Sequence, residues 1–93
     1  MRTIERTTQF KKDFKREVGG QHGASLQKVL TEVVTCLAND QLLPAAKRDH
    51  ALKGLMKDHR ECHVKPDLLL VYRKPNDAIL KLVRLGSHSE LFD

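Results

Sequence analysis

The sequence is poor in aromatic residues and cysteines, and it has no long apolar run. Tryptophan is absent, and one tyrosine and three phenylalanines bring the aromatic content to only 4%. The core of this 93-residue chain must therefore be built from leucine, valine and isoleucine. Because no apolar run approaches the ~20 residues of a membrane-spanning helix, and because no signal peptide is recognised, we expect a cytosolic protein.

Two cysteines are too few for a disulfide framework. Cys36 falls on the apolar face of a predicted helix, and Cys62 falls on a predicted strand, on the same side as Val64. Both thiols are therefore expected to be buried and reduced. The length predicts a single domain that spans residues 1–93, with one modest core.

An acidic excess is also absent. Lysine and arginine outnumber aspartate and glutamate by 17 to 12, which gives a net charge of +5 and an isoelectric point near 9.5. Such a balance favours a polyanionic partner, bound more weakly as salt rises. The charge alone leaves nucleic acid and an acidic protein segment open as partners.

Two amphipathic helices are predicted in the first half of the chain. Phe10, Phe14 and Val18 recur at four-residue spacing after Thr8, a predicted N-cap, and Gly19–Gly20 ends this first helix. The outer face of the helix is basic: Lys11, Lys12, Lys15 and Arg16. A longer apolar stripe follows, with Ser25 as the predicted N-cap and Asn39–Asp40 as the end: Leu26, Val29, Leu30, Val33, Val34 and Leu37. The short link predicts an antiparallel helical hairpin.

The second half of the chain is predicted to be a long loop followed by strands. Residues 41–59 lose their periodicity, and Leu52 and Leu55 are expected to anchor this loop. Strands are predicted over residues 60–65, 68–72 and 78–85, with turns at Pro66–Asp67 and over residues 74–77. Residues 1–6 are a predicted weak edge strand. The order β-α-α-β-β-β indicates an α+β fold, in which a small, mainly antiparallel sheet packs on the N-terminal helical hairpin.

The five histidines leave two chemical interpretations. A metal site on His59 and His63 is disfavoured, because residues four apart on a strand lie about 13 Å apart, whereas zinc–ligand bonds are about 2 Å. His22 lies in the glycine-rich link and is expected to be a solvated loop residue.

The other interpretation is metal-free acid–base cleavage of RNA, with the 2′-hydroxyl as nucleophile. Histidine suits the two proton transfers because its ordinary pKa is ~6.5, and cationic side chains suit the charge on the phosphorane. The candidates for the proton transfers are His50, His63, His88 and Asp67. The candidates for charge stabilisation are Lys53, Arg60 and Arg84. The alternative is that these are scattered surface residues.

A set of spaced motifs between Leu43 and Phe92 resembles the YafQ family of toxins, which belong to bacterial type II toxin–antitoxin systems and to the wider RelE-like group. The residues that carry the resemblance are Leu43–Pro44, Lys47–His50, Leu52, Gly54, Arg60, His63–Val64, Pro66–Asp67, Tyr72, Arg84, Gly86, His88 and Leu91–Phe92. The N-terminal half agrees only in helical pattern and length.

The resemblance implies a microbial-RNase-like fold and metal-independent cleavage of mRNA in the ribosomal A site, without a cofactor. The family's catalytic positions match His50, His63, Asp67 and His88, and Phe92 contributes near the C-terminus. Glu61 stands where the family has an aspartate. We expect His88 to be the general acid and His50 or Asp67 the base. Phe92 is expected to stack on a base or, alternatively, to anchor the C-terminus in the core.

The implied partners are the ribosome with its rRNA, the mRNA, and a cognate antitoxin, a DinJ-like ribbon-helix-helix protein with an acidic segment. DNA contact is expected only through the antitoxin complex, and no membrane partner is expected. Two alternatives remain: a non-catalytic ParE-like toxin directed at gyrase, and a basic nucleic-acid-binding module. Neither would need the histidine set.

Overall fold

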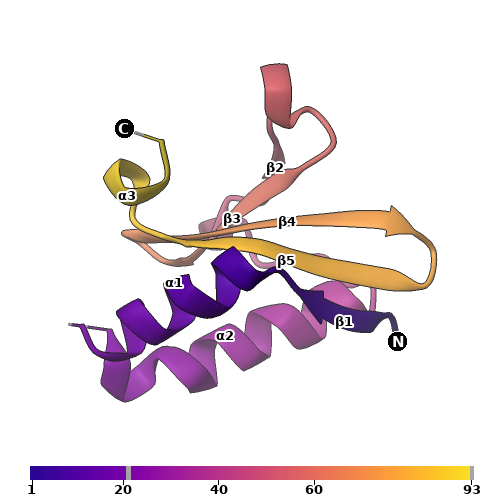
Figure 1. Ribbon diagram of the computed structural model, residues 1–93. Helices are drawn as coiled ribbons and strands as arrows, with labels where there is room; N and C mark the ends of the chain where they lie inside the picture. Colours follow the sequence, from indigo (N-terminus) through magenta and orange to yellow (C-terminus); the bar gives the residue numbers. More distant parts are fainter. Residues whose placement is uncertain (21, 93) are drawn as a thin grey trace.

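The computed structural model describes residues 1–20 and 22–92, which form a mixed sheet, two long helices and a short C-terminal helix (Figure 1). The elements run in the order β1 (Thr3–Arg6), α1 (Thr8–Val18), α2 (Gly23–Ala38), η1 (Ala45–Lys47), β2 (His50–Ala51), η2 (Gly54–Met56), β3 (Arg60–Lys65), β4 (Leu68–Asn76), β5 (Ile79–Gly86) and α3 (His88–Phe92). The two η elements are single 3₁₀ turns.

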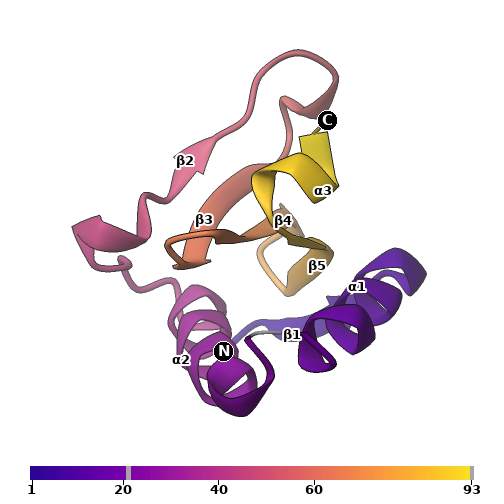
Figure 2. The same cartoon turned by 90° about the vertical axis from the view of Figure 1, so that its left-hand side faces the viewer.

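The five strands lie in the order β1-β5-β4-β3-β2. β1 runs parallel to β5 at one edge, and the other pairs are antiparallel. α1 and α2 cover one face, whereas α3 and the segment that carries β2 rise on the other face (Figures 1 and 2). The α+β prediction, with its helical hairpin on a mainly antiparallel sheet, is thus confirmed.

Two elements were not predicted. β2 is a two-residue strand inside the segment expected to be an irregular loop, and α3 forms from the residues after Gly86. β4 also extends to Asn76, so the turn lies at Asp77–Ala78, later than predicted. Asp93, the last residue of the predicted domain, lies outside the described residues.

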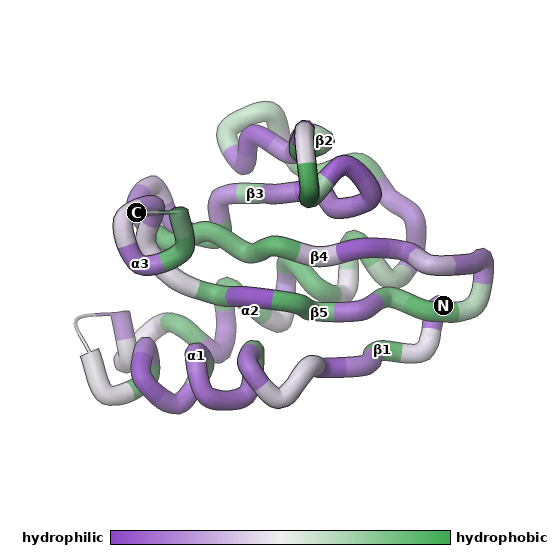
Figure 3. The backbone as a smooth tube through the Cα atoms, turned by 45° about the horizontal axis from the view of Figure 1, so that its top comes forward, coloured by the Kyte–Doolittle hydropathy of each residue, from purple (hydrophilic) through white to green (hydrophobic). Residues whose placement is uncertain are grey.

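The core lies between the helices and the central strand β4. Leu68, Leu70 and Tyr72 face α1 and α2, and Leu69 and Val71 are buried on the opposite face. The predicted central strand, buried on both sides, is therefore confirmed. Figure 3 shows the first half of β4 as hydrophobic and its far half as hydrophilic.

The helix ends correct two predictions. The N-cap of α1 is Thr7, one residue before the predicted Thr8, because the extended Thr7 lets its Oγ1 accept from Phe10 N at 2.9 Å. α2 begins at Gly23 with His22 as N-cap, so Ser25 lies within the first helical turn. Val18, the last residue of α1, is exposed rather than part of the core.

Residues 41–59 are anchored by polar contacts as well as by Leu52, which is half-buried. Leu55 is fully exposed, so its predicted anchoring role was wrong. Asp49 instead accepts hydrogen bonds from Tyr72 at 2.6 Å and from Arg60 at 3.1 Å. Since Tyr72 is a core residue, this pair fixes the loop to the sheet.

The two thiols differ in their surroundings. Cys62 is fully buried, as predicted, and burial raises its pKa to about 12, so the thiolate is not accessible at neutral pH. Cys36 is only partly buried, because it lies at the end of α2 and donates to the carbonyls of Gln41 and Leu42 at 3.4 Å. Along the described chain, no helix is both long and apolar enough to cross a membrane.

Candidate active site

A pocket of about 360 Å³ lies on the sheet face that the long helices leave open. Four segments form it: β3, the β3–β4 turn, the start of β4, and the junction between β5 and α3. Its lining residues are Glu61, His63, Pro66, Asp67, Leu69, Ser87, His88 and Ser89. The pocket therefore brings together four of the residues singled out in the sequence, from positions 61 to 88.

His63 enters the pocket because side chains alternate along β3. Cys62 and Val64 point into the core, so Glu61 and His63 point to the open face. His63 Nδ1 lies 3.1 Å from the carbonyl oxygen of Pro66. Since a carbonyl only accepts, Nδ1 carries the proton and Nε2 of the neutral ring is free to accept one.

His50 and Glu61 are cross-strand partners in the β2–β3 pair. His50 Nε2 lies 4.0 Å from Glu61 Oε1, and His50 Nδ1 donates to the Arg48 carbonyl at 2.7 Å. Arg48 has a left-handed backbone (φ 50°), which turns the chain between η1 and β2. Glu61 is only 7% exposed and lines the pocket. His50 lies beside the pocket, and its contact with Glu61 connects it to the pocket interior.

Asp67 is placed at the rim by the β3–β4 turn and faces a histidine that was not predicted to take part. Asp67 Oδ1 lies 3.5 Å from His22 Nε2. The expectation that His22 is a solvated loop residue is wrong, because only 12% of its side chain is exposed. Its place at the start of α2, beneath the turn, buries it against Asp67.

α3 carries His88 and Phe92 one helical turn apart. Their ring centroids are 5.4 Å apart with an interplanar angle of 48°. Phe92 is 41% exposed, so it is not a core anchor and its ring is accessible for stacking on a base. The start of α3 is a capping box, in which Glu90 Oε1 accepts from Ser87 N at 2.8 Å and Ser87 Oγ accepts from Glu90 N at 3.1 Å.

The candidate cations lie outside the lining of this pocket. Arg84 is next to Val71 on the open face by register, but its Nε donates to the buried Asp13 at 2.7 Å. Arg60 is held by Asp49, and Lys53 is exposed in the loop ahead of η2. The structure thus does not gather Lys53, Arg60 and Arg84 at the histidines.

Four pocket residues, Pro66, Leu69, Ser87 and Ser89, were absent from the predicted site, as was His22. Ser87 and Ser89 flank His88, and the Ser87-x-x-Glu90 spacing was a readable sign of a helix start. Leu69 supplies the apolar floor. His22 carried no such sign, because only the packing of α2 beneath the turn brings it to Asp67.

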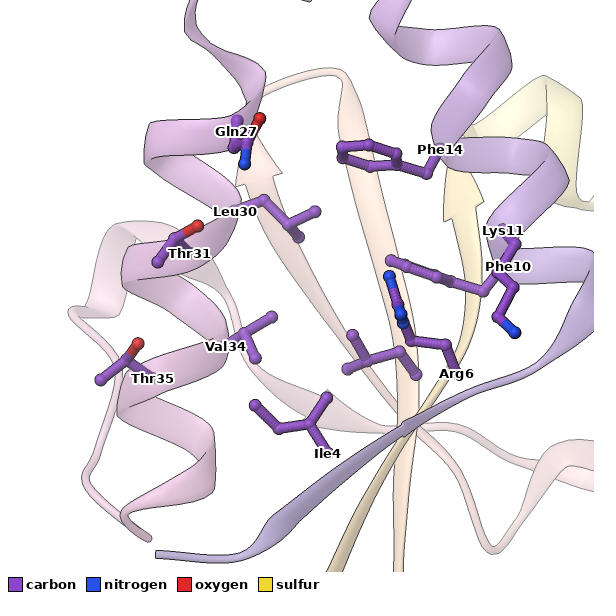
Figure 4. Close-up of a pocket in the computed structure, with 11 residues that line it drawn as sticks. Ile4, Arg6, Phe10, Lys11, Phe14, Gln27, Leu30, Thr31, Val34 and Thr35 are labelled. Carbon is purple, nitrogen blue, oxygen red and sulfur yellow. The ribbon is translucent and has the colours of Figure 1, made fainter.

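A larger groove, of about 450 Å³, lies on the helical side. Figure 4 shows Phe10 and Phe14 from α1 opposite Leu30 and Val34 from α2. No histidine or carboxylate lines this groove. It therefore lacks groups that transfer protons near neutral pH, and the smaller pocket is the better candidate for chemistry.

Comparison with known proteins agrees with this geometry. Residues 2–93 match the family model described as the bacterial toxin of type II toxin–antitoxin system, YafQ. The mRNA interferase toxin YafQ of Escherichia coli K12 is 39% identical over 92 residues, which cover 98% of this chain and 96% of that protein.

Solved structures are similar over almost the whole chain. A metal-bound toxin from Helicobacter pylori is 53% identical with a TM-score of 0.84, and covers 99% of this chain and all of its own. The toxin in the E. coli DinJ–YafQ complex is 36% identical with a TM-score of 0.83, over 99% of this chain and 98% of that one. In the described part of the present chain, no group of three or more His, Cys, Asp and Glu side chains is placed to hold a metal ion.

The family match over nearly the full length, the fold, and the histidines on the open sheet face all agree. This chain belongs to the YafQ family of bacterial toxins of type II toxin–antitoxin systems.

Proposed function

We propose that this protein is a ribosome-dependent endoribonuclease that cleaves mRNA in the A site and thereby stops translation. The observation that carries the proposal is the pocket in which His63, Asp67 and His88 meet beside the buried Glu61. The curated relative named as an mRNA interferase, at 39% identity, supports it. Cytoplasmic location follows from the proposed substrate.

The proposed reaction needs two proton transfers and no external nucleophile. A base removes the proton of the 2′-hydroxyl, and the 2′-oxygen attacks the adjacent phosphorus. The bond to the 5′-oxygen breaks, and the general acid protonates that oxygen as it leaves. The products are a 2′,3′-cyclic phosphate and a free 5′-hydroxyl.

We assign the acid to His88, which lines the pocket and whose ring lies against Phe92. Asp67 and His50 are the candidates for the base, and Glu61 supports His50 at 4.0 Å. His63, with Nδ1 fixed on Pro66, presents Nε2 to the scissile phosphate or to the base. Arg84, Arg60 and Lys53 would bind RNA phosphates around the pocket.

The proposed partners are the ribosome, its mRNA, and an antitoxin. A DinJ-like antitoxin is supported by the DinJ–YafQ complex, whose toxin shares 36% identity with this chain. Its acidic segment would cover the open face, and DNA would be contacted through the antitoxin complex. The net charge of +5 suits both RNA and an acidic segment.

The test is His88→Gln, with His59→Gln as the matched control. His59 is a half-buried histidine outside the pocket, whereas His88 is exposed, so the control makes the same substitution at a site away from the pocket. A proton-transferring residue contributes about 10²–10⁴-fold, so His88→Gln should lose that much cleavage of mRNA on programmed ribosomes.

The control should cleave as wild type does. Wild-type cleavage by His88→Gln would remove His88 from the mechanism. DNA damage without translation-dependent mRNA cleavage, after induction in cells, would favour the gyrase-directed alternative instead.

A further inference from the structure

We propose that the last turn of α1 positions the catalytic histidine: Arg16 and Glu17 bind Glu90, and this contact holds α3 so that His88 faces the pocket. The inference rests on the proposed function for the role of His88. It adds Glu90 and Arg16 as positioning residues, neither of which touches the substrate.

α3 cannot hold its own position. It has five residues, whereas isolated helices shorter than about 12 residues are marginal in water. It follows β5 directly, with only Ser87 between the two elements. External contacts must therefore set the direction in which His88 points.

Glu90 is the residue that links the start of α3 to the rest of the protein. Its Oε1 accepts from the backbone N of Ser87, the residue immediately before His88. Its Oε2 lies 3.1 Å from Arg16 Nε on α1. One carboxylate thus joins the first turn of α3 to the last turn of α1.

Arg16 is itself fixed at several points. Its guanidinium donates to Leu85 O at 2.9 Å, to Glu17 at 2.8 Å and to Asp13 at 3.0 Å. Leu85 and Glu90 lie on either side of Gly86, so Arg16 spans the junction between β5 and α3. A planar guanidinium with all its nitrogens engaged is a rigid support.

Glu17 adds a second contact to Glu90. Burial raises the pKa of Glu17, and its hydrogen bond with Glu90 raises it further. The Ser87 amide lowers the pKa of Glu90, and the bond with Glu17 acts in the same direction. Arg16 Nε lies 2.8 Å from Glu17 Oε2 and 3.1 Å from Glu90 Oε2, so one guanidinium bridges the two carboxyl groups.

Gly86 permits the close approach. A Cβ at this position would lie 2.9 Å from an Arg16 guanidinium nitrogen and 3.2 Å from Glu90 Oε1. A methyl group there would push apart the two partners of the contact without removing either charge. Gly86→Ala is therefore an independent way to disturb the same geometry.

The end of α1 and the start of α2 also lie beside Asp67, on the other side of the active-site pocket from His88. A second pocket of about 350 Å³ is lined by Arg16, Glu17, Gly20, His22, Asp67, Ser87 and Glu90. It shares Asp67 and Ser87 with the active-site pocket. The tip of the helical hairpin therefore lies directly behind the segments that carry Asp67 and His88.

The experiment compares Glu90→Ala, Glu90→Gln and Gly86→Ala with Glu32→Ala, an exposed carboxylate on α2. Single-turnover cleavage on programmed ribosomes gives the rate, and ribosome titration gives the affinity. Displacement of a reacting group by about 1 Å can cost on the order of 10²-fold, so Glu90→Ala should lower the rate by about that factor and leave the affinity unchanged. Gly86→Ala should do the same.

Glu90→Gln should cleave faster than Glu90→Ala, because the amide oxygen still accepts from Ser87 N. Glu32→Ala should match wild type. Wild-type rates for both Glu90→Ala and Gly86→Ala would overturn the inference.

A second readout does not depend on cleavage. The ring resonances of His88 in NMR spectra report its order, and they should shift and broaden in Glu90→Ala but not in Glu32→Ala. If the wild-type protein fails to cleave RNA, the proposed function fails, but this readout still tests whether the contact of Glu90 with α1 positions His88. Unchanged His88 resonances in a folded Glu90→Ala protein would overturn the positioning role of Glu90 and leave the proposed function standing.

Discussion

Two carboxylates, Glu61 and Asp67, each hold one of the histidines around the site. Glu61 faces His50 at 4.0 Å, and Asp67 faces His22 at 3.5 Å. His63 instead binds the backbone carbonyl of Pro66. Each imidazole therefore has a different partner, so substitutions of the three partners should affect catalysis to different degrees.

Glu61→Gln keeps the volume of the side chain but removes the negative charge that faces His50. Because Glu61 supports a candidate base rather than transferring the proton, cleavage should fall on the order of 10-fold, less than the 10²–10⁴-fold of a proton-transferring residue. Single-turnover assays on programmed ribosomes measure this, with Glu32→Gln as an exposed control. Equal rates for Glu61→Gln and wild type would limit Glu61 to packing.

The sequence motifs predicted part of this site. His63, Asp67 and His88 were singled out together, and the structure places them around one pocket. His22 was not, because its proximity to Asp67 arises only when α2 packs under the β3–β4 turn. Arg84 was expected near the phosphate, but the pattern could not reveal that Asp13 on α1 binds its guanidinium.

At the scale of elements, α1 continues the edge of the sheet where β1 stops. β1 pairs with β5 up to Leu82, and the Thr7 side chain then donates to Val83 O at 2.8 Å. Further along, the Asp13 carboxylate accepts from Leu85 N at 3.0 Å. Side chains of α1 thus satisfy backbone groups of β5 that have no strand beside them.

Asp13→Asn should destabilise the protein by about 2 kcal/mol, because breaking a buried charge pair costs about 3–5 kcal/mol and Arg84 is partly exposed. Urea unfolding at neutral pH measures the change. Asp40→Asn is the matched control: Asp40 is exposed and pairs with Arg2 and Lys74, so the loss of its charge should destabilise the protein much less than Asp13→Asn does. Equal losses would show that burial of the Asp13 pair contributes nothing.

Acid should destabilise the wild type through the same carboxylate. Burial alone would raise the pKa of Asp13, but hydrogen bonds from Arg84, Leu85 N and Gln9 outweigh it and lower the pKa. A carboxyl whose folded-state pKa lies below its unfolded value of ~3.9 stabilises fully above that value and loses the stabilisation as pH falls. Unfolding free energies between pH 7 and pH 3 should therefore fall more steeply for wild type than for Asp13→Asn.

The elements that were predictable share a strong period or an unbroken apolar run. The helical period of α2 and the apolar run at the start of β4 can both be read in the sequence. β2 is too short for a period, and its polar residues form a strand only because β3 lies beside it. α3 is similarly short and depends on the Glu90 contact with α1.

Over the whole molecule, the helical and open faces serve different purposes. The long helices cover one face of the sheet, and His50, His63 and His88 lie on the other. On the open face, Arg73 and Lys81 are paired across β4 and β5. This basic pair lies further along the same face as the pocket, where RNA phosphates would pass.

Lys81→Gln should weaken ribosome binding and lower the slope of log affinity against log salt by about 1, as for the loss of one phosphate contact. Lys28→Gln, an exposed lysine on the opposite helical layer, is the control and should leave the slope unchanged. Titrations at several salt concentrations measure both. Identical slopes would place the RNA away from β5.

The position of α3 after every other described element has a consequence for synthesis. The sheet and both long helices emerge from the ribosome before His88 does, so the scaffold can fold while the pocket still lacks its acid. Arg16 and Glu17 are then already in place to receive Glu90. On the proposed role of His88, the nascent chain therefore builds the scaffold of the pocket before it carries the group that would protonate the leaving oxygen.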